Sequence, residues 1–306
     1  MASEDLGRNL MLYRSKTVNI IIGINVFIFA LEFLTVAAPD LNLEFFSSLA
    51  LYHPRSEQFQ FYQFITHIFM HGGVWHLAIN MFILWMFGNV LEGVWGPKRF
   101  LIFYFVTGLG AAGLHLGTTT YRLDILQQEV QQYAEDPNPK DFTQFTEEHI
   151  TPLLENMPAR MARRYQAYDS LTERWQENPD AAGAEDKSIS LIRDYYQNVV
   201  NTPTVGASGA IYGLLLAFGI LFPNMLILLF FFIPIKAKYF VILLGLFELY
   251  LGVFGGDTNI ANFAHLGGML FGFILLKIWG VKPGEVERLI KEHGKGRKED
   301  NEAEQI

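Results

Sequence analysis

A serine and a histidine that lie far apart in the sequence, each in an apolar stretch, are the residues best suited to chemistry. Ser208 stands near the start of an apolar run that ends at Phe222, and His265 lies in an apolar run over residues 260–281. A serine hydroxyl is a poor nucleophile until a neighbouring base takes its proton, and histidine is the usual base. If the fold joins these two side chains, the pair predicts acyl transfer through a serine nucleophile.

Each residue taken alone has a simpler structural interpretation. The stretch Gly206-Ala207-Ser208-Gly209 is typical of a small-residue packing surface, and a lone histidine in an apolar helix is typical of a hydrogen-bonded core residue. Polar groups at one depth on several spans are harder to explain by packing, because ionisable residues inside a membrane usually serve a function. The catalytic hypothesis therefore depends on the elements that position the pair.

Six apolar stretches are candidates for positioning it within a membrane. Apolar residues make up 51% of the 306-residue chain, and a helix needs roughly 20 mainly apolar residues to cross a hydrocarbon core. We expect an all-α membrane protein, a bundle of six transmembrane helices, over residues 18–38, 74–90, 100–116, 207–222, 239–254 and 260–281. The shorter apolar stretch 225–235 is interrupted by Pro234 and predicts a hairpin or re-entrant segment.

The basic residues orient the predicted bundle. Lys and Arg gather before the first span, between the second and third, between the fourth and fifth, and after the sixth, which are alternate sides of the membrane. By the positive-inside rule both termini are expected in the cytoplasm. Ser208 and His265 then lie near the outer ends of the fourth and sixth spans, at similar depth. A bacterial inner membrane is the expected location.

Donors for a developing negative charge are predicted on the second span. Attack on an amide carbonyl creates an oxyanion, which has to be met by preorganised hydrogen-bond donors. His76 and Asn80 are four residues apart and so share one helical face near the outer end of that span. The start of the fourth span adds backbone N–H groups and the positive end of a helix dipole.

Four ordered motifs together resemble the rhomboid intramembrane serine proteases. They are similar to the nucleophile helix, the alanine–histidine helix, the histidine-rich entry with its His-x-x-x-Asn helix, and the Glu-x-x-x-Gly turn of that family. The matching residues are Gly206-Ala207-Ser208-Gly209 with Tyr212; Ala264-His265-Leu266-Gly267-Gly268 with Gly272; His67, His71 and His76-Leu77-Ala78-Ile79-Asn80; and Glu92 with Gly96. The resemblance covers about residues 17–119 and 204–280.

Carried over by position, the resemblance implies an intramembrane serine endopeptidase with a Ser208–His265 catalytic dyad and no aspartate. It implies an oxyanion hole of His76, Asn80 and the Ser208 backbone N–H. Supporting roles would fall to Gly206, Gly209, Tyr212, Asn262 and Gly268, with the Tyr212 ring stacked on His265. The implied fold is a six-helix bundle with a water-filled cavity, a short central fourth span, and the fifth span and residues 255–259 as gate and cap.

The same resemblance implies no metal and no organic cofactor, and it makes transmembrane proteins in the lipid bilayer the expected substrates. The chain has no cysteine, which excludes thiol catalysis, disulfides and cysteine-ligated metals. The sequence shows neither a basic stripe nor a phosphate-binding glycine loop, so we expect no nucleic-acid partner.

Residues 120–203 differ in character from the apolar stretches. Residues 121–200 hold 15 Asp and Glu against 8 Lys and Arg, and short amphipathic helical patterns alternate with Asn-Pro and Asp-Pro breaks. We expect a helical extramembrane insert that selects substrates, binds a partner or has no separate role. Its aromatic residues could form a core of their own or lie against the membrane: Tyr165, Tyr168, Trp175, Tyr195 and Tyr196.

The expected organisation is a cytoplasmic segment 1–16, a transmembrane core 17–119 and 204–281, the insert 120–203 and a charged cytoplasmic tail 282–306. Two other functions remain open. A catalytically inactive rhomboid-like protein would bind membrane clients. A transporter or channel could use Glu32, Glu248 and Asn262, although no internal repeat or pair of broken helices favours it.

Overall fold

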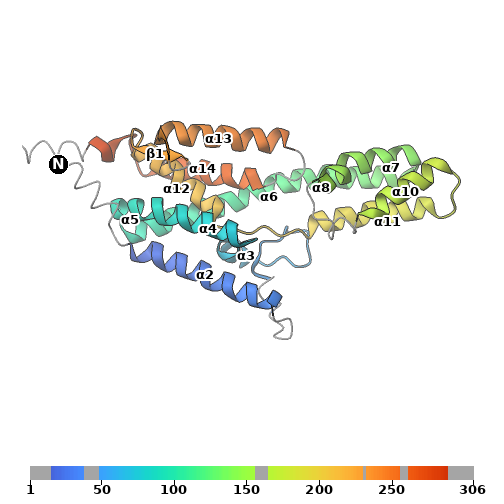
Figure 1. Cartoon of the computed structure of the whole chain (residues 1–306), viewed down its shortest axis with the longest axis horizontal. Helices are drawn as coiled ribbons and strands as arrows, with labels where there is room; N and C mark the ends of the chain where they lie inside the picture. The colour runs from blue at the N-terminus through green and yellow to red at the C-terminus, as the bar shows by residue number, and fades with distance from the viewer. Residues whose placement is uncertain (1–14, 38–47, 156–164, 230–231, 256–260, 289–306) are drawn as a thin grey trace, which may run out of the picture.

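The computed structural model describes residues 15–37, 48–155, 165–229, 232–255 and 261–288. Its helices form a bundle from which a second, smaller group of helices extends at one end (Figure 1). The bundle contains α2 (Lys16–Ala37), α3 (Gln63–Thr66), α4 (Val74–Ile83), α5 (Asn89–Trp95), α6 (Pro97–Glu135), α12 (Ser208–Leu221), α13 (Ala237–Phe254) and α14 (Ala261–Ile278). A 3-10 turn, His67–Phe69, follows α3, and a π-helical segment, Leu84–Gly88, joins α4 to α5.

The smaller group of helices is formed by the residues that were expected as an insert. It consists of the end of α6 together with α7 (Pro139–Phe145), the π-helical segment Thr146–Ile150, α8 (Thr151–Glu155), α10 (Gln166–Glu177) and α11 (Ala184–Val200). The boundary expected at residues 119 and 120 falls inside α6, which continues for 39 residues without a break. The insert is therefore joined to the bundle by a continuous helix rather than by a flexible linker.

A separate hydrophobic core holds the insert together. Tyr168, Trp175 and Tyr195 are all buried in it, and the Phe142 and Tyr168 rings stack with centroids 6.2 Å apart. The Trp175 indole N–H donates to the Pro179 carbonyl at 3.0 Å, so its polar atom is satisfied inside the apolar cluster. Of the two arrangements that the sequence left open for these aromatic residues, the structure shows an internal core.

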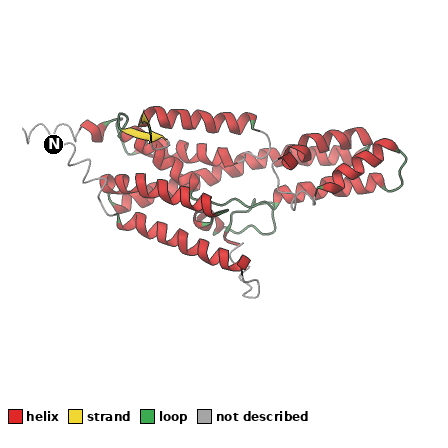
Figure 2. Ribbon diagram, viewed as in Figure 1, coloured by secondary structure: helices red, strands yellow, loops and turns green. Residues whose placement is uncertain are grey.

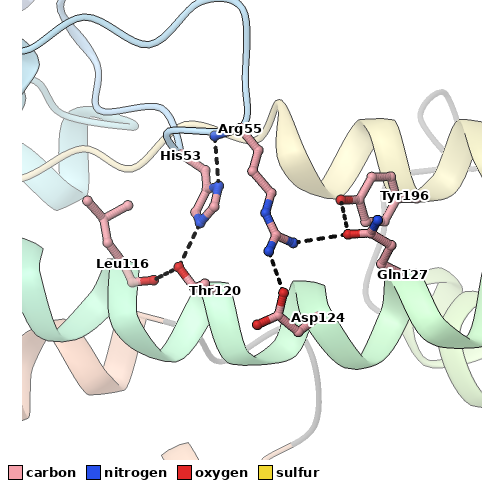
Figure 3. A network of polar contacts seen from close by, with 7 residues as sticks. All are labelled: His53, Arg55, Leu116, Thr120, Asp124, Gln127 and Tyr196. Atoms are coloured by element: carbon pink, nitrogen blue, oxygen red, sulfur yellow. Dashed lines mark hydrogen bonds and ion pairs between the residues drawn. The ribbon is translucent and has the colours of Figure 1, made fainter.

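The first loop of the bundle fastens the base of the insert (Figure 3). His53 Nε2 lies 2.9 Å from Thr120 Oγ1, and the Arg55 guanidinium pairs with the Asp124 carboxylate on α6. The Gln127 side chain then accepts from both Arg55 and Tyr196 of α11, at 3.5 and 3.4 Å. Loop, α6 and α11 are thus linked where α6 leaves the bundle.

Three helices, α6, α12 and α14, make the most extensive contacts in the bundle. Their backbones approach so closely that side chains would not fit at two glycines. A Cβ on Gly209 would lie 2.3 Å from Ala111 Cβ, and a Cβ on Gly268 would lie 1.8 Å from the Gly209 carbonyl oxygen. The small residues therefore permit direct backbone contact, as glycine does in membrane helices generally.

The Glu-x-x-x-Gly turn has a structural explanation. The buried Glu92 carboxylate accepts the backbone N–H groups of Thr17 and Val18, at 3.3 and 3.0 Å, at the start of α2. A negative charge there satisfies helix donors that have no intrahelical partner. Gly96, with φ of 75°, ends α5 and directly precedes Pro97 at the start of α6. The turn joins three helices at one end of the bundle.

Within the described residues, five stretches of helix are long and apolar enough to span a membrane, and the 14-residue α12 is a shorter apolar helix at the centre. The expected spans agree with these helices to within a few residues, apart from the long extension of α6. The apolar stretch expected as a hairpin or re-entrant segment forms an antiparallel pair of strands, β1 (Leu226–Leu229) and β2 (Ile233–Lys236), the one sheet in the described part of the chain (Figure 2). Of the residues expected to form the cap, 256–259 lie outside the described residues.

Candidate active site

The structure brings Ser208 and His265 into hydrogen-bonding contact. Ser208 is the first residue of α12 and His265 lies in the second turn of α14, and the distance from Ser208 Oγ to His265 Nε2 is 2.9 Å. Both side chains are half-buried, which leaves them partly accessible. The approach depends on the Gly209–Gly268 backbone contact, one residue beyond Ser208 and three beyond His265.

The imidazole of His265 is held from its face and from its far edge. Tyr212 stacks on it with ring centroids 4.0 Å apart and an interplanar angle of 4°. The His265 Nδ1 atom lies 3.1 Å from Oε2 of Glu248 on α13. The Nδ1 atom has no aligned hydrogen bond in this structure, so the contact is one of ion-pair distance.

Glu248 joins three of the residues around the site. Its Oε1 accepts the Tyr212 hydroxyl, and its Oε2 accepts the Asn262 side-chain amide at 2.7 Å while facing His265. The carboxylate is buried. The sequence suggested Glu248 only as part of a polar path across the membrane, because no local motif surrounds it. An ionisable residue within a span was the one available signal.

His76 lies beside the entry to α12. A Cβ on Gly206 would be 3.1 Å from His76 Nε2 and 3.7 Å from Ser208 Oγ, so the ring edge and the serine flank this glycine. The Gly206 φ of 127° is one that side chains rarely adopt, a second reason for glycine here. His76 Nδ1 accepts the Gly72 N–H at 3.3 Å, which leaves the proton of a neutral ring on Nε2. Nε2 can therefore act as a donor.

Asn80 lies one helical turn after His76 on α4 and is 4% exposed. Its amide nitrogen is buried and has no acceptor among the described residues. Buried donors are nearly always paired, so an orphan of this kind calls for an explanation. The Asn80 amide is therefore a hydrogen-bond donor that is available to an acceptor from outside the described residues.

Main-chain bonds fix the segment that leads into α12. Leu51 and Thr204 exchange both backbone hydrogen bonds, at 2.9 and 2.8 Å, and the Gly206 N–H donates to the His67 carbonyl at 2.9 Å. The Thr204 hydroxyl also lies 2.5 Å from His115 Nε2 of α6. The position of Ser208 is thus set by the first loop and by α6 as well as by α12.

Two histidines of the first loop sit in low-polarity surroundings. Burial lowers the pKa of His67 and of His71 to about 4 in each case, so both rings are neutral at neutral pH. His71 packs edge-on against His76 with centroids 5.1 Å apart. The His71 ring therefore supports His76 without adding a positive charge beside it.

A cavity of about 700 Å³ lies where the insert meets the bundle. Its walls come from α6, the π-helical segment Thr146–Ile150, α8, α11 and the segment before α12, and single residues at the starts of α10 and α14 also contribute. The lining includes Arg122, His149, Tyr195, Thr204, Val205 and Ala261. The cavity thus adjoins the main-chain segment that leads to Ser208.

A cluster of three or more metal-ligating side chains is not present within the described ranges. The expected supporting residues are all found near the Ser208–His265 pair or in the helix contacts that form it. Tyr212 stacks on His265, Asn262 reaches it through Glu248, Gly206 lies between His76 and Ser208, and Gly209 meets Gly268. The arrangement can deliver a serine hydroxyl to a histidine base within an apolar helix bundle.

Comparison with known proteins assigns the family. A sequence model of the rhomboid domain matches residues 58–123 and 187–281, which is more than half of the chain. The chain belongs to the rhomboid family. One curated relative, the rhomboid protease GluP of Bacillus subtilis (strain 168), is 36% identical over 52 residues, a match that covers 17% of this chain and 10% of that protein. The comparison with solved structures gave no significant match.

The matched regions cover the bundle from α3 onward without α2, and they leave most of the insert outside apart from α11. With five helices of membrane-spanning length and the rhomboid domain, the protein is a multi-pass membrane protein with an all-α, rhomboid-like bundle. That part of the expectation from sequence is confirmed.

Proposed function

We propose that this protein is an intramembrane serine endopeptidase that hydrolyses a peptide bond in or next to the transmembrane segment of other membrane proteins. The observation that carries the proposal is the 2.9 Å contact between Ser208 Oγ and His265 Nε2 at the mouth of a short helix in an apolar bundle.

The reaction would proceed by acyl transfer. Ser208 Oγ attacks the scissile carbonyl carbon while its proton passes to His265 Nε2, and the same proton then goes to the leaving amine as the C–N bond breaks. Water, activated by His265, next attacks the acyl-serine; its proton returns through His265 to Ser208 Oγ as the acid product leaves. No metal or organic cofactor enters these steps.

The oxyanion of each tetrahedral intermediate would be met by His76, Asn80 and the Ser208 backbone N–H. The protonated Nε2 of His76 flanks Gly206 beside the serine, and the unpaired Asn80 amide supplies a second side-chain donor. The Ser208 N–H lies at the start of α12, where the helix dipole favours negative charge. Groups fixed in advance stabilise the transition state more than groups that must reorganise.

A substrate helix would have to unwind before its carbonyl could reach Ser208, since a helical backbone in lipid is already hydrogen-bonded to itself. We therefore expect cleavage near helix-weakening residues. In the proposed orientation both termini are cytoplasmic, the site opens to the opposite side of a bacterial inner membrane, and the insert stands on that side. The insert would then be placed to meet a substrate or partner protein.

The proposal is tested by a fluorophosphonate probe, which reacts only with an activated serine. In the detergent-solubilised protein we expect the adduct to map by mass spectrometry to the peptide that contains Ser208. Labelling should be lost in His265→Ala and kept in Ser170→Ala, a control at an exposed serine of the insert. A folded wild-type protein that stays unlabelled would contradict the proposal and favour the client-binding alternative.

Asn80→Ala should lower kcat by about 10²- to 10³-fold, the usual cost of losing one oxyanion donor. KM should change little, because the donor acts on the transition state rather than on the bound substrate. The measurement is cleavage of a reporter transmembrane protein in liposomes. Ile79→Ala, at the neighbouring exposed position, is the control and should keep its kcat. Equal kcat values for Asn80→Ala and wild type would remove Asn80 from the oxyanion hole.

A further inference from the structure

We propose that Glu248 is a positioning residue for His265, so that Ser208, His265 and Glu248 act as a triad in which the carboxylate orients the histidine of the dyad. This inference rests on the proposed function and adds to it a third member. It comes from the position of one carboxylate, which the fifth span places at the edge of the imidazole away from the serine.

The first argument concerns the tautomer of His265. A neutral imidazole carries its proton on one nitrogen only, and an ionised carboxylate can only accept. Glu248 Oε2 lies 3.1 Å from His265 Nδ1, which favours the proton on that nitrogen. Nε2 is then left with a free lone pair toward Ser208, 2.9 Å away. This is the form that can take the serine proton.

The second argument concerns charge. When the Ser208 proton reaches Nε2, His265 becomes an imidazolium, and a negative charge 3.1 Å from Nδ1 stabilises that state. The contact is not an aligned hydrogen bond in the resting structure. Such contacts commonly tighten when the reaction begins. Glu248 does not take the proton in this scheme; it holds the ring and compensates its charge.

The third argument concerns how the carboxylate itself is held. Tyr212 donates its hydroxyl to Oε1, and Asn262 donates its amide to Oε2 at 2.7 Å. The same Tyr212 stacks on His265, and Asn262 lies one turn before His265 on α14. Two neutral donors therefore fix a buried charge without neutralising it. A carboxylate placed only for packing would not need to be oriented toward the histidine by both of its neighbours.

The test is Glu248→Gln, which keeps the size of the side chain and removes its charge. We expect kcat on a reporter transmembrane substrate to fall about 100-fold, within the range for impaired general-base catalysis, with KM within about twofold of wild type. The rate of fluorophosphonate labelling should fall by a similar factor. Glu32→Gln is the matched control, a carboxyl within the span α2, and should keep both rates.

A spectroscopic readout separates positioning from a structural role. In protein labelled with ¹⁵N-histidine, the resonance missing from His265→Ala identifies the His265 ring. Wild type should show the proton on Nδ1, and Glu248→Gln should show a mixture of tautomers. Unchanged kcat, labelling rate and tautomer in a folded Glu248→Gln protein would overturn the inference. Absence of labelling in wild type would instead overturn the proposed function, so the two failures are distinguishable.

Discussion

Ser208→Ala is expected to abolish proteolysis, lowering the cleavage rate of a reporter membrane protein by about 10⁴-fold or more, to the background of the assay. The hydroxyl oxygen is the proposed nucleophile, and an alanine side chain has no group that could form the acyl intermediate in its place. The Ser208 hydroxyl makes a side-chain hydrogen bond to His265, so removing the hydroxyl should change the free energy of unfolding by only about 1 kcal/mol.

The measurement is cleavage in liposomes at matched protein concentrations, with helix content and thermal unfolding recorded for each variant. Ser170→Ala, at an exposed position of α10, should cleave at the wild-type rate. Residual cleavage by Ser208→Ala that is sensitive to a fluorophosphonate would mean that another serine carries the activity.

Gly268→Ala is expected to reduce fluorophosphonate labelling by about 100-fold or more, and to lower the unfolding temperature, although Gly268 has no side chain to take part in the reaction. The added Cβ would lie 1.8 Å from the Gly209 carbonyl oxygen, and a backbone atom has no rotamer by which to move away. Helix α14 must then shift from α12, which carries His265 away from Ser208. A displacement of about 1 Å can cost a factor near 10² in rate.

Gly113→Ala is the matched control for this prediction. Gly113 lies in the membrane-spanning part of α6 and has no atom within 4 Å of the position that its Cβ would take. Alanine there should be neutral or slightly stabilising, by up to about 1 kcal/mol, because it favours the helix. Full labelling and an unchanged unfolding temperature in Gly268→Ala would contradict the close helix contact itself.

The sequence was informative where a physical rule connects distant residues. The lengths of the apolar stretches predicted the spans. The alternation of basic loops predicted that Ser208 and His265 lie at one depth. The structure then shows the 2.9 Å contact between them. Their roles in catalysis stay a prediction until labelling is measured.

Glu248 shows what such rules cannot reach. Its contact with His265 is set by how α13 packs against α14. The sequence around a single carboxylate in an apolar helix does not indicate which residue of another helix the carboxylate contacts. The continuity of α6 is a second case. Its composition changes near Thr120 from apolar to amphipathic, yet a helix tolerates both, and no proline breaks the backbone there. Composition therefore indicated a boundary that the backbone does not have.

The unbroken α6 also acts as a rigid strut. At 1.5 Å per residue, its 39 residues extend for about 58 Å, and the hydrocarbon core accounts for roughly 30 Å of that length. In the proposed arrangement the remaining 28 Å or so would set the height and direction of the insert, and the Arg55–Asp124 pair links α6 to the first loop at the base of this segment. A protein bound at the tip of the insert would therefore be held at a set distance from the bilayer. Only its segment nearest the membrane could then approach Ser208.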